Sequence, residues 1–247
     1  MAKVDPIKKV VKESYAKIAQ SSECCCNCGC DSNNKAQRQS GKMGYSQSEM
    51  DKAPQGSNLG LGCGNPTAIA SLKEGEVVLD LGSGAGFDAF LASPKVGTTG
   101  KVIGVDMTDE MLEKARENAS KGNYSNVEFR KGDIESLPID GATIDAIISN
   151  CVINLAPNKD KVFKEAYRVL KTGGRLMVSD VVLIRSLPEK IKNDKELLVG
   201  CVSGAILKEE YLNLLREAGF TDVTIYKETP AFLEEYAVSM TYSAFKS

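Results

Sequence analysis

Between residues 76 and 184 the sequence alternates short apolar runs with segments of helical periodicity. The apolar runs have the length of buried strands, and they are VVLDL (77–81), KVIGVD (101–106), NVEFRKG (126–132), IDAIISN (144–150) and GRLMVSDVVLI (174–184). They are separated by helical patterns near 87–93, 109–121 and 159–171. Strands joined by helices form a parallel sheet that is covered on both faces. The pattern therefore predicts an α/β fold around one core.

The two ends of the chain extend this pattern. Residues 5–20 place apolar side chains at spacings of three and four, which predicts a short amphipathic helix. A further helix is expected at about 208–218. Two last strands, TDVTIYKE (221–228) and EYAVSMTYSAFK (235–246), would close the sheet with an antiparallel hairpin.

The stretch between the first helix and the sheet is polar. From Ser21 to about Gln55 it is rich in Gly, Ser and Asn, which predicts a mobile loop or lid. Asn65 and Pro66 then have the residue types of an N-cap and a first helical residue, so a short helix to Leu72 is expected. Cys63 lies directly before that helix in a glycine-rich loop, a context that favours an accessible thiol.

The chain contains no histidine. This absence excludes serine-hydrolase triads and histidine-containing zinc sites, because histidine is the usual base in the first and a usual ligand in the second. The chemistry must therefore depend on cysteine, carboxylate, lysine or tyrosine side chains, or on a cofactor that brings its own reactivity.

Charge and cysteine content narrow the possibilities further. Lys and Arg number 31 against 33 Asp and Glu, without a long basic run, so we expect no nucleic-acid partner. No apolar stretch is long enough to span a bilayer, and the N-terminus lacks a signal-peptide core, so we expect a cytoplasmic protein without membrane contact. In that reducing compartment the eight cysteines favour metal, metalloid or redox chemistry over a disulfide framework.

A glycine-rich loop follows the first predicted strand in VVLDLGSGAGFDAF. Glycines at the carboxyl end of a strand permit tight turns and close approach of a ligand. The dinucleotide fingerprint would require glycine at position 87, where this chain has Phe87. The pattern D-x-G-x-G-x-G instead resembles the first motif of class I S-adenosylmethionine methyltransferases. This resemblance implies a seven-stranded Rossmann-like sheet and a cofactor contact by Asp80, Gly82, Ser83, Gly84 and Gly86.

Later positions match the same cofactor in order. Asp106 ends the second strand about twenty residues beyond the loop, where a carboxylate can accept both hydroxyls of a ribose. Met107 beside it could cover an adenine face. In KGDIESLP the family resemblance places the adenine amine and ring edge at Asp133, Ile134 and Glu135. The alternative for each position taken alone is an ordinary turn or strand-end residue.

Two further residues are assigned to the cofactor crevice. Asn150 ends the fourth strand at the rim where open α/β sheets bind ligands. Tyr45 could place its ring near a positively charged sulfur, and packing under a lid is the alternative role for it.

Three cysteines outside the N-terminal cluster occupy informative positions. Cys151 follows the fourth strand at the crevice rim, and Cys201 lies on or near a helix after the fifth strand. Free cysteine is often buried, so a core role is the alternative for both. Cys63, between two glycines, is harder to interpret as core.

The segments NLGLGCGNP, ISNCVINL and GCVSGA together resemble the arsenite S-adenosylmethionine methyltransferases, and the similarity extends from ESYAKIA to the last hairpin. It implies that Cys63, Cys151 and Cys201 bind trivalent arsenic and that an N-terminal cysteine joins a thiol–disulfide relay. Of the five cysteines in CCCNCGC, Cys25 or Cys26 is expected to be that member. A structural zinc site of four thiolates is the alternative for the cluster.

The resemblance also implies a division of the chain. Residues 1–70 would form an N-terminal helix with a Cys-rich mobile loop or lid, residues 71–184 the cofactor-binding core, and residues 185–247 the acceptor-site helices and closing hairpin.

Arsenic chemistry agrees with this interpretation. Trivalent arsenic is soft and favours thiolates. Its lone pair can attack the methyl carbon of the cofactor, and no proton needs to leave the arsenic in that step. The expected substrate is arsenite, a small molecule taken as a thiol complex, and glutathione or thioredoxin would serve as thiol reductant. Two alternatives remain: methyl transfer to a small organic acceptor such as a quinone or sterol, and a non-catalytic protein that binds soft metals or metalloids.

Overall fold

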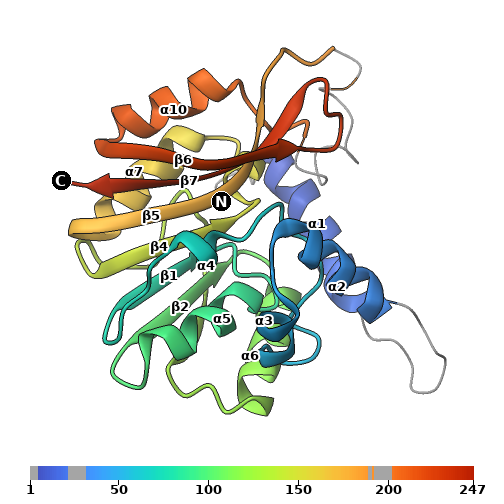
Figure 1. Cartoon of the computed structure of the whole chain (residues 1–247), viewed down its shortest axis with the longest axis vertical. Coiled ribbons are helices and arrows are strands. Elements are labelled where there is room, and N and C mark those ends of the chain that lie inside the picture. The colour runs from blue at the N-terminus through green and yellow to red at the C-terminus, as the bar shows by residue number, and fades with distance from the viewer. Residues whose placement is uncertain (1–4, 22–31, 189–190, 192–201) are drawn as a thin grey trace.

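The computed structural model of the chain describes residues 5–21, 32–188, 191 and 202–247. One seven-stranded sheet forms its centre, with the strands in the order β3-β2-β1-β4-β5-β7-β6 (Figure 1). The strands are β1 (Val77–Leu81), β2 (Lys101–Asp106), β3 (Val127–Lys131), β4 (Ile144–Asn150), β5 (Leu170–Leu183), β6 (Phe220–Pro230) and β7 (Ala237–Lys246). A seven-stranded sheet agrees with the prediction.

The sheet is parallel except at one end. Strands β1 to β5 pair in parallel, whereas β7 runs antiparallel to both β5 and β6. The expected closing hairpin is therefore present, with its second strand inserted next to β5. From β1 the chain proceeds outward through β2 and β3, then returns to place β4 on the other side of β1. This reversal opens a crevice at the carboxyl ends of β1 and β4.

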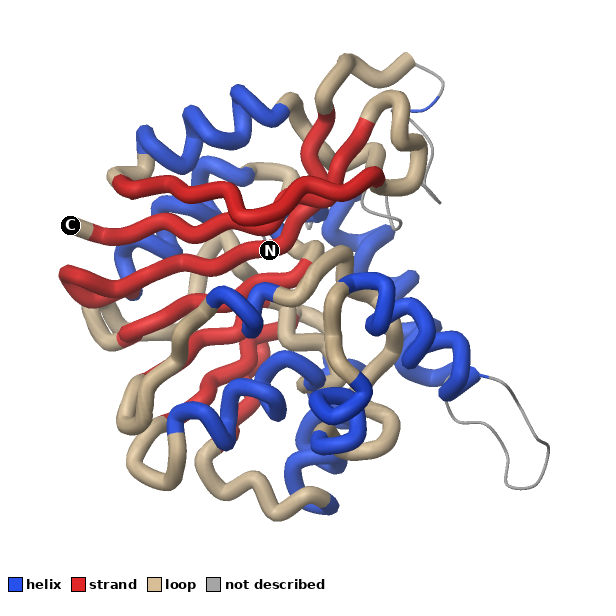
Figure 2. The backbone as a smooth tube through the Cα atoms, in the orientation of Figure 1, coloured by secondary structure: helices blue, strands red, loops and turns tan. Residues whose placement is uncertain are grey.

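Helices cover both faces of the sheet, as Figure 2 shows. On one face lie α5 (Phe87–Val96) and α6 (Asp109–Lys121), and on the other lie α7 (Lys159–Val169) and α10 (Lys208–Glu217). Successive side chains of β1 alternate between the two cores, with Val78 in the first and Leu79 in the second. Because both faces are buried at the centre of the sheet, β1, β2 and β4 are largely apolar, and this is the pattern that predicted them.

The boundary between α7 and β5 differs from the prediction. The helix ends at Val169 and the strand begins at Leu170, four positions before the expected start at Gly174. Leu170 pairs with Ile144, and the register then shifts before regular pairing resumes. Gly173, with φ of 78°, lies within this irregularity. A sequence pattern gives no signal for such a register shift.

The expectation of a loop from Ser21 to Gln55 is wrong for the part that the structure describes. This region contains α2 (Ser32–Met43) and α3 (Gln47–Lys52). Their polar side chains suit a helix surface, and Ser46 forms a capping box with Glu49 that begins α3. Residues 22–31 lie outside the described part of the chain.

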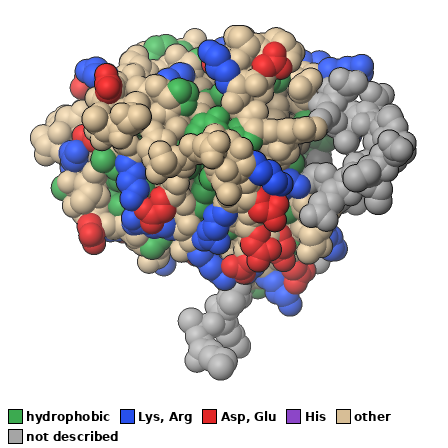
Figure 3. All heavy atoms as spheres, turned by 90° about the horizontal axis from the view of Figure 1, so that it is seen from below, with side chains coloured by type: hydrophobic (Ala, Val, Ile, Leu, Met, Phe, Trp, Pro, Cys, Tyr) green, Lys and Arg blue, Asp and Glu red, His purple; other side chains and the backbone are tan. Residues whose placement is uncertain are grey.

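The other helices surround the end of the sheet where the crevice opens. Helix α1 (Pro6–Ser21) agrees with the prediction and packs against α6 and the short 3-10 helix η1 (Ile153–Leu155). Helix α4 (Pro66–Ile69) has the predicted Asn65 cap and ends before the expected Leu72. In the described part of the chain, no helix combines the length and the apolar character that crossing a membrane would require. Acidic and basic side chains are intermixed on the face in Figure 3.

One ion pair ties β5 to the segment that precedes β1. Both terminal nitrogens of Arg175 donate to the carboxylate of Glu76, at 2.8 and 2.7 Å, and the same guanidinium donates to the carbonyls of Ala70 and Ser71. The two charged side chains are each 14% exposed. The pairing with Arg175 is one cause that lowers the pKa of Glu76 in the folded protein, against the opposing effect of burial.

Replacing Arg175 with Met should lower the free energy of unfolding by about 2 kcal/mol, because a partly buried carboxylate and two carbonyls lose a charged donor. Urea unfolding measures the change. The matched control is Lys164→Met. Lys164 is 60% exposed and pairs with Asp160 on the surface, so its loss should lower the free energy of unfolding by less than about 0.5 kcal/mol. Equal losses in the two variants would contradict this assignment.

Candidate functional site

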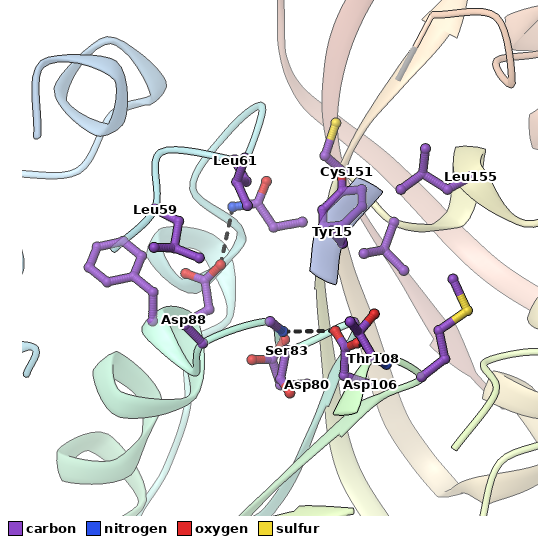
Figure 4. A pocket seen from close by; sticks show the side chains of 18 of the residues that line it. Tyr15, Leu59, Leu61, Asp80, Ser83, Asp88, Asp106, Thr108, Cys151 and Leu155 are labelled. Atoms are coloured by element: carbon purple, nitrogen blue, oxygen red, sulfur yellow. Dashed lines mark hydrogen bonds between the residues drawn. The ribbon is translucent and has the colours of Figure 1, made fainter. Parts of the chain in front are cut away.

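A cavity opens at the carboxyl ends of β1, β2 and β4, where the strand order reverses. It encloses about 1110 Å³, counting the space at its mouth. Figure 4 shows Asp80, Ser83 and Asp106 on one side of it and Cys151 on another. The wall is completed by helix α1, which contributes Tyr15, and by the loop 57–62.

Three carboxylates line this cavity: Asp80 on β1 and Asp88 on α5 are buried, and Asp106 on β2 is half-buried. Burial is the main cause that raises the pKa of each, most strongly for Asp80, and the neighbouring charges of Asp88 and Asp106 raise the pKa of Asp80 further. Within the described part of the chain, Asp80 Oδ2 and the hydroxyl of Ser83 have no hydrogen-bond partner. A concentration of negative charge with unsatisfied oxygens suits a cationic ligand that carries hydrogen-bond donors.

Different surroundings require glycine at the three glycine positions of the loop. A methyl group on Gly84 would meet only Met111 Sδ, at 4.0 Å, so this position borders open space. A Cβ at Gly82 would lie 2.2 Å from Val152 Cγ2, and one at Gly86 would lie 2.6 Å from Phe90. All three have positive φ. Gly86, expected in the cofactor set, is not among the lining residues and serves the packing of two aromatic rings, whereas Gly84 borders the cavity.

The ribose and adenine candidates are grouped as the sequence suggested, with one exception. Asp106 accepts N–H hydrogen bonds from Gly84 at 3.0 Å and Thr108 at 2.8 Å, which fixes its carboxylate at the cavity wall. Met107 lines the cavity beside it. At the other end, Asp133 and Ile134 line the cavity and Glu135 does not.

Glu135 is held by an ion pair with Lys8 of α1, which accounts for its position. The Lys8 ammonium group lies 2.5 Å from Asp133 Oδ2 and 2.7 Å from Glu135 Oε2. Lys8 is the only described cavity residue with a cationic side chain, and both of its partners are acidic residues of the segment after β3. The N-terminal helix is therefore attached directly to that segment, and no sequence pattern predicts this contact.

Tyr45, Asp88 and Asn150 form a connected group. The Tyr45 hydroxyl donates to Asp88 Oδ1 at 2.6 Å, and its ring meets Phe87 edge-on. The Asn150 amide nitrogen donates to the Tyr45 oxygen and to Asp88 Oδ2, at 2.9 and 3.1 Å. Sequence analysis missed Asp88; its position in the first turn after the glycine loop was the available signal.

The two described cysteines of interest share one apolar cluster, to which Tyr15 and Met107 also belong. Cys151 is 4% exposed and has a φ of 60°, a conformation that costs a residue other than glycine about 1 kcal/mol. Cys63 is half-buried, and its carbonyl accepts a hydrogen bond from Ser239 at 2.7 Å. Retained strain at a cavity wall is typical of functional positions.

The remaining sequence-predicted cysteines, Cys25, Cys26 and Cys201, lie outside the described residues, as does the CCCNCGC cluster with its zinc alternative. Val202, the neighbour of Cys201, belongs to the same apolar cluster as Cys63 and Cys151. Among the residues that the structure does describe, no three Cys, Asp or Glu side chains are arranged to hold a metal ion.

Comparison with known proteins agrees with this geometry. Residues 72–219 match the family model described as "Methyltransferase domain". The chain is 45% identical to an arsenite methyltransferase of Halobacterium salinarum, over 97% of this chain and 66% of that protein. It is 40% identical to an arsenite methyltransferase of Aquipseudomonas alcaligenes, over 75% of this chain and 58% of the other. The chain thus spans less than two thirds of the length of these relatives.

A solved structure gives the same result. The crystal structure of an arsenic(III) S-adenosylmethionine methyltransferase from Chlamydomonas reinhardtii superposes with a TM-score of 0.64 at 35% identity, covering 85% of this chain and 73% of that one. The sheet order, the glycine loop and the acidic cavity define a methyltransferase of the S-adenosylmethionine class. Within that class, the chain belongs to the arsenite methyltransferase family.

The glycine loop generates a test that separates packing from ligand contact. Gly84→Ala should cost about 1 kcal/mol of stability through its positive φ while weakening S-adenosylhomocysteine binding by at least about tenfold, because the methyl group enters the cavity. Gly86→Ala should cost about 3 kcal/mol, since overpacking adds to the strain. Urea unfolding and calorimetric titration measure both quantities. Wild-type affinity in Gly84→Ala would show that position 84 does not face the ligand.

Proposed function

We propose that this chain transfers the methyl group of S-adenosylmethionine to trivalent arsenic, as arsenite or methylarsenite, held by cysteine thiolates. The observation that carries the proposal is the position of Cys63 and Cys151 in one apolar cluster, with Cys151 on the wall of a cavity lined by unsatisfied carboxylate. Such a site combines soft ligands for the acceptor with acidic groups for a cationic donor.

The residues around the cavity fit the cofactor. Asp80 and Ser83 have buried oxygens without partners and would take its hydrogen-bond donors. Asp106 would accept the ribose hydroxyls, while Met107 and Ile134 would pack against the adenine and Asp133 would accept its amine. When bound, S-adenosylmethionine supplies an electrophilic methyl group attached to a sulfonium. Tyr45 lies in the cavity wall with its hydroxyl held by Asp88, so its ring has a fixed orientation toward the bound group.

The acceptor side requires positioning more than acid–base catalysis. Three thiolates, those of Cys63, Cys151 and Cys201, would complete the pyramidal coordination of trivalent arsenic and leave its lone pair free to form the new bond to carbon. Since no proton leaves the arsenic, no general base is needed, which agrees with a chain that lacks histidine. The surrounding apolar cluster keeps water away from the reacting atoms.

Turnover also needs electrons, because methyl transfer oxidises the arsenic. Two cysteine thiols that form a disulfide would return it to the trivalent state, and glutathione or thioredoxin would then reduce that disulfide. Cys25 or Cys26 is the proposed N-terminal member of this relay. Such a cycle suits the reducing conditions of the cytoplasm.

A small organic acceptor is the second candidate, and the apolar lining of the cavity favours it. Val11, Tyr15, Leu59, Leu61 and Leu155 contribute to that lining. An apolar wall would equally accept a quinone-like ring, whereas the left-handed backbone at Cys151 favours the thiolate site.

The direct test is incubation with S-adenosylmethionine, arsenite and glutathione, followed by chromatography with elemental detection of arsenic. We expect methylated arsenic from the wild type and none from Cys151→Ser or Cys201→Ser, while both variants bind S-adenosylhomocysteine with wild-type affinity. Glu117→Ser, on the surface of α6 with a side chain that is 66% exposed, is the control and should remain active. Full activity in either cysteine variant would refute the thiolate site, and arsenite binding without product would indicate sequestration.

The buried carboxylates predict a pH dependence for cofactor binding. Burial raises the pKa of Asp80, so this carboxyl keeps its proton to a higher pH than an exposed aspartate does when the cavity is empty. A bound cation favours the ionised form and lowers that pKa, so binding releases protons and the affinity falls as the pH falls through the raised pKa.

Calorimetric titration of S-adenosylmethionine in buffers with different ionisation enthalpies measures the released protons. Asp80→Asn should reduce the release and flatten the pH profile, with the remainder due to Asp88 and Asp106. Proton uptake on binding, or a profile that the substitution leaves unchanged, would contradict the assignment.

A further inference from the structure

A series of hydrogen bonds connects Asp88 to the backbone of Cys63. Asp88 belongs to the first turn of α5 and is 8% exposed. Its Oδ2 accepts a hydrogen bond from the amide nitrogen of Asn150 at 3.1 Å, and Figure 4 shows Asp88 directed toward that donor. The amide oxygen of Asn150 accepts from the backbone N–H of Cys63 at 2.9 Å and of Gly64 at 3.4 Å.

The polarity of this connection is determined by Asp88. An ionised carboxylate only accepts hydrogen bonds, so Asn150 must direct its NH₂ group toward Asp88. Its carbonyl oxygen then faces the two backbone donors. An amide turned by 180° would place its oxygen against the carboxylate and its NH₂ group against the N–H groups of Cys63 and Gly64. Both contacts would be repulsive, so the carboxylate and the backbone groups around Cys63 together select one orientation of the amide.

The loop that carries Cys63 fits closely around this amide. A Cβ on Gly62 would lie 2.5 Å from the Asn150 amide nitrogen, and one on Gly64 would lie 2.5 Å from the Ser179 hydroxyl. The Gly64 carbonyl also accepts a hydrogen bond from the Asn150 amide, at 2.9 Å. A change in the orientation of the amide would therefore displace the backbone on both sides of Cys63.

We propose that Asp88 is a positioning residue that fixes the thiol of Cys63 by orienting the Asn150 amide. Asp88 also holds the Tyr45 hydroxyl, so one carboxylate determines the orientation of a group on the cofactor side and the position of a thiol on the acceptor side. Only the catalytic consequence rests on the proposed function; the positioning of Cys63 does not require arsenic.

The primary experiment measures the reactivity of Cys63 in the full chain. Iodoacetamide labelling is followed at the Cys63 peptide by mass spectrometry, with Cys151 as an internal reference. In Asp88→Asn, an NH₂ group replaces one carboxylate oxygen and can face the Asn150 amide nitrogen, which requires an acceptor. Labelling of Cys63 should therefore accelerate by about fivefold or more, the size expected for side chains that interact directly. Labelling of Cys151 should stay near its wild-type rate.

Two controls separate positioning from general loosening. Asp51→Asn removes an exposed carboxylate from α3 and should change neither rate. Tyr45→Phe removes the donor to Asp88 Oδ1 and one acceptor of the Asn150 amide, but it keeps the contact between Asp88 and Asn150. The Cys63 rate should therefore stay within about twofold of wild type. Acceleration in Tyr45→Phe equal to that in Asp88→Asn would overturn the proposed route through Asn150.

A variant in which the two side chains are exchanged, with Asp at position 150 and Asn at position 88, keeps the proposal testable if Asp88→Asn does not fold. Asn150→Asp places two carboxylates in contact and should accelerate Cys63 labelling. Adding Asp88→Asn restores a donor–acceptor contact while Asp at 150 still accepts from Cys63, so the double variant should return part of the way to the wild-type rate. Failure of the second substitution to lower the rate of the first would overturn the proposal.

The consequence for turnover is measured with arsenite and S-adenosylmethionine. In Asp88→Asn, kcat should fall at least about tenfold, with a smaller change in KM for the cofactor. An unchanged kcat together with an altered Cys63 rate would remove the catalytic consequence and leave the positioning intact. Absence of arsenic methylation in the wild type would instead refute the proposed function, whatever the labelling rates.

Discussion

The burial of several carboxylates at one edge of the sheet is the constraint on which the site depends. Parallel strands end at the same edge, so the reversal of strand order between β1 and β4 brings Asp80, Asp106 and Asn150 together from distant positions in the sequence. Burial without cations is costly for carboxylates. The protein offsets this cost with backbone N–H groups at Asp106 and with side-chain donors at Asp88. At Asp80 one oxygen is left unsatisfied, where a ligand can donate a hydrogen bond.

The acidic cavity also explains how the N-terminal helix is placed. Lys8 forms ion pairs with Asp133 and Glu135 in the segment after β3, so α1 is held by charge against the carboxyl end of the sheet. Near the middle of the cavity wall, Tyr15 from the same helix joins the apolar cluster of Cys63 and Cys151. The wall is thus built from the beginning of the chain, the loop 57–62 and the strand ends, and no single segment contains the site.

The fold was predictable from sequence because its signals are periodic. Strands that are buried on both faces are continuous apolar runs, and β1, β2 and β4 agree with the predicted boundaries. The helices α2 and α3 were missed, since their polar surfaces resemble a loop in composition and only the capping box at Ser46 marks a helix start. Asp80, Ser83 and Asp106 line the cavity at the positions that their motifs predicted. Lys8 and Asp88 were missed, because their roles come from contacts between segments far apart in the chain.

Cys151 has a backbone conformation that favours glycine or asparagine, and this preference bears on how the sequence can change over time. A descendant that no longer needed a thiol there would gain backbone stability by exchanging it for a residue that adopts this conformation without strain. Under the proposed function, selection for the thiol would act against this local preference for glycine. The residue at position 151 is accordingly a more sensitive record of whether a related chain still handles a thiophilic acceptor than the glycine loop, which any methyl donor would preserve.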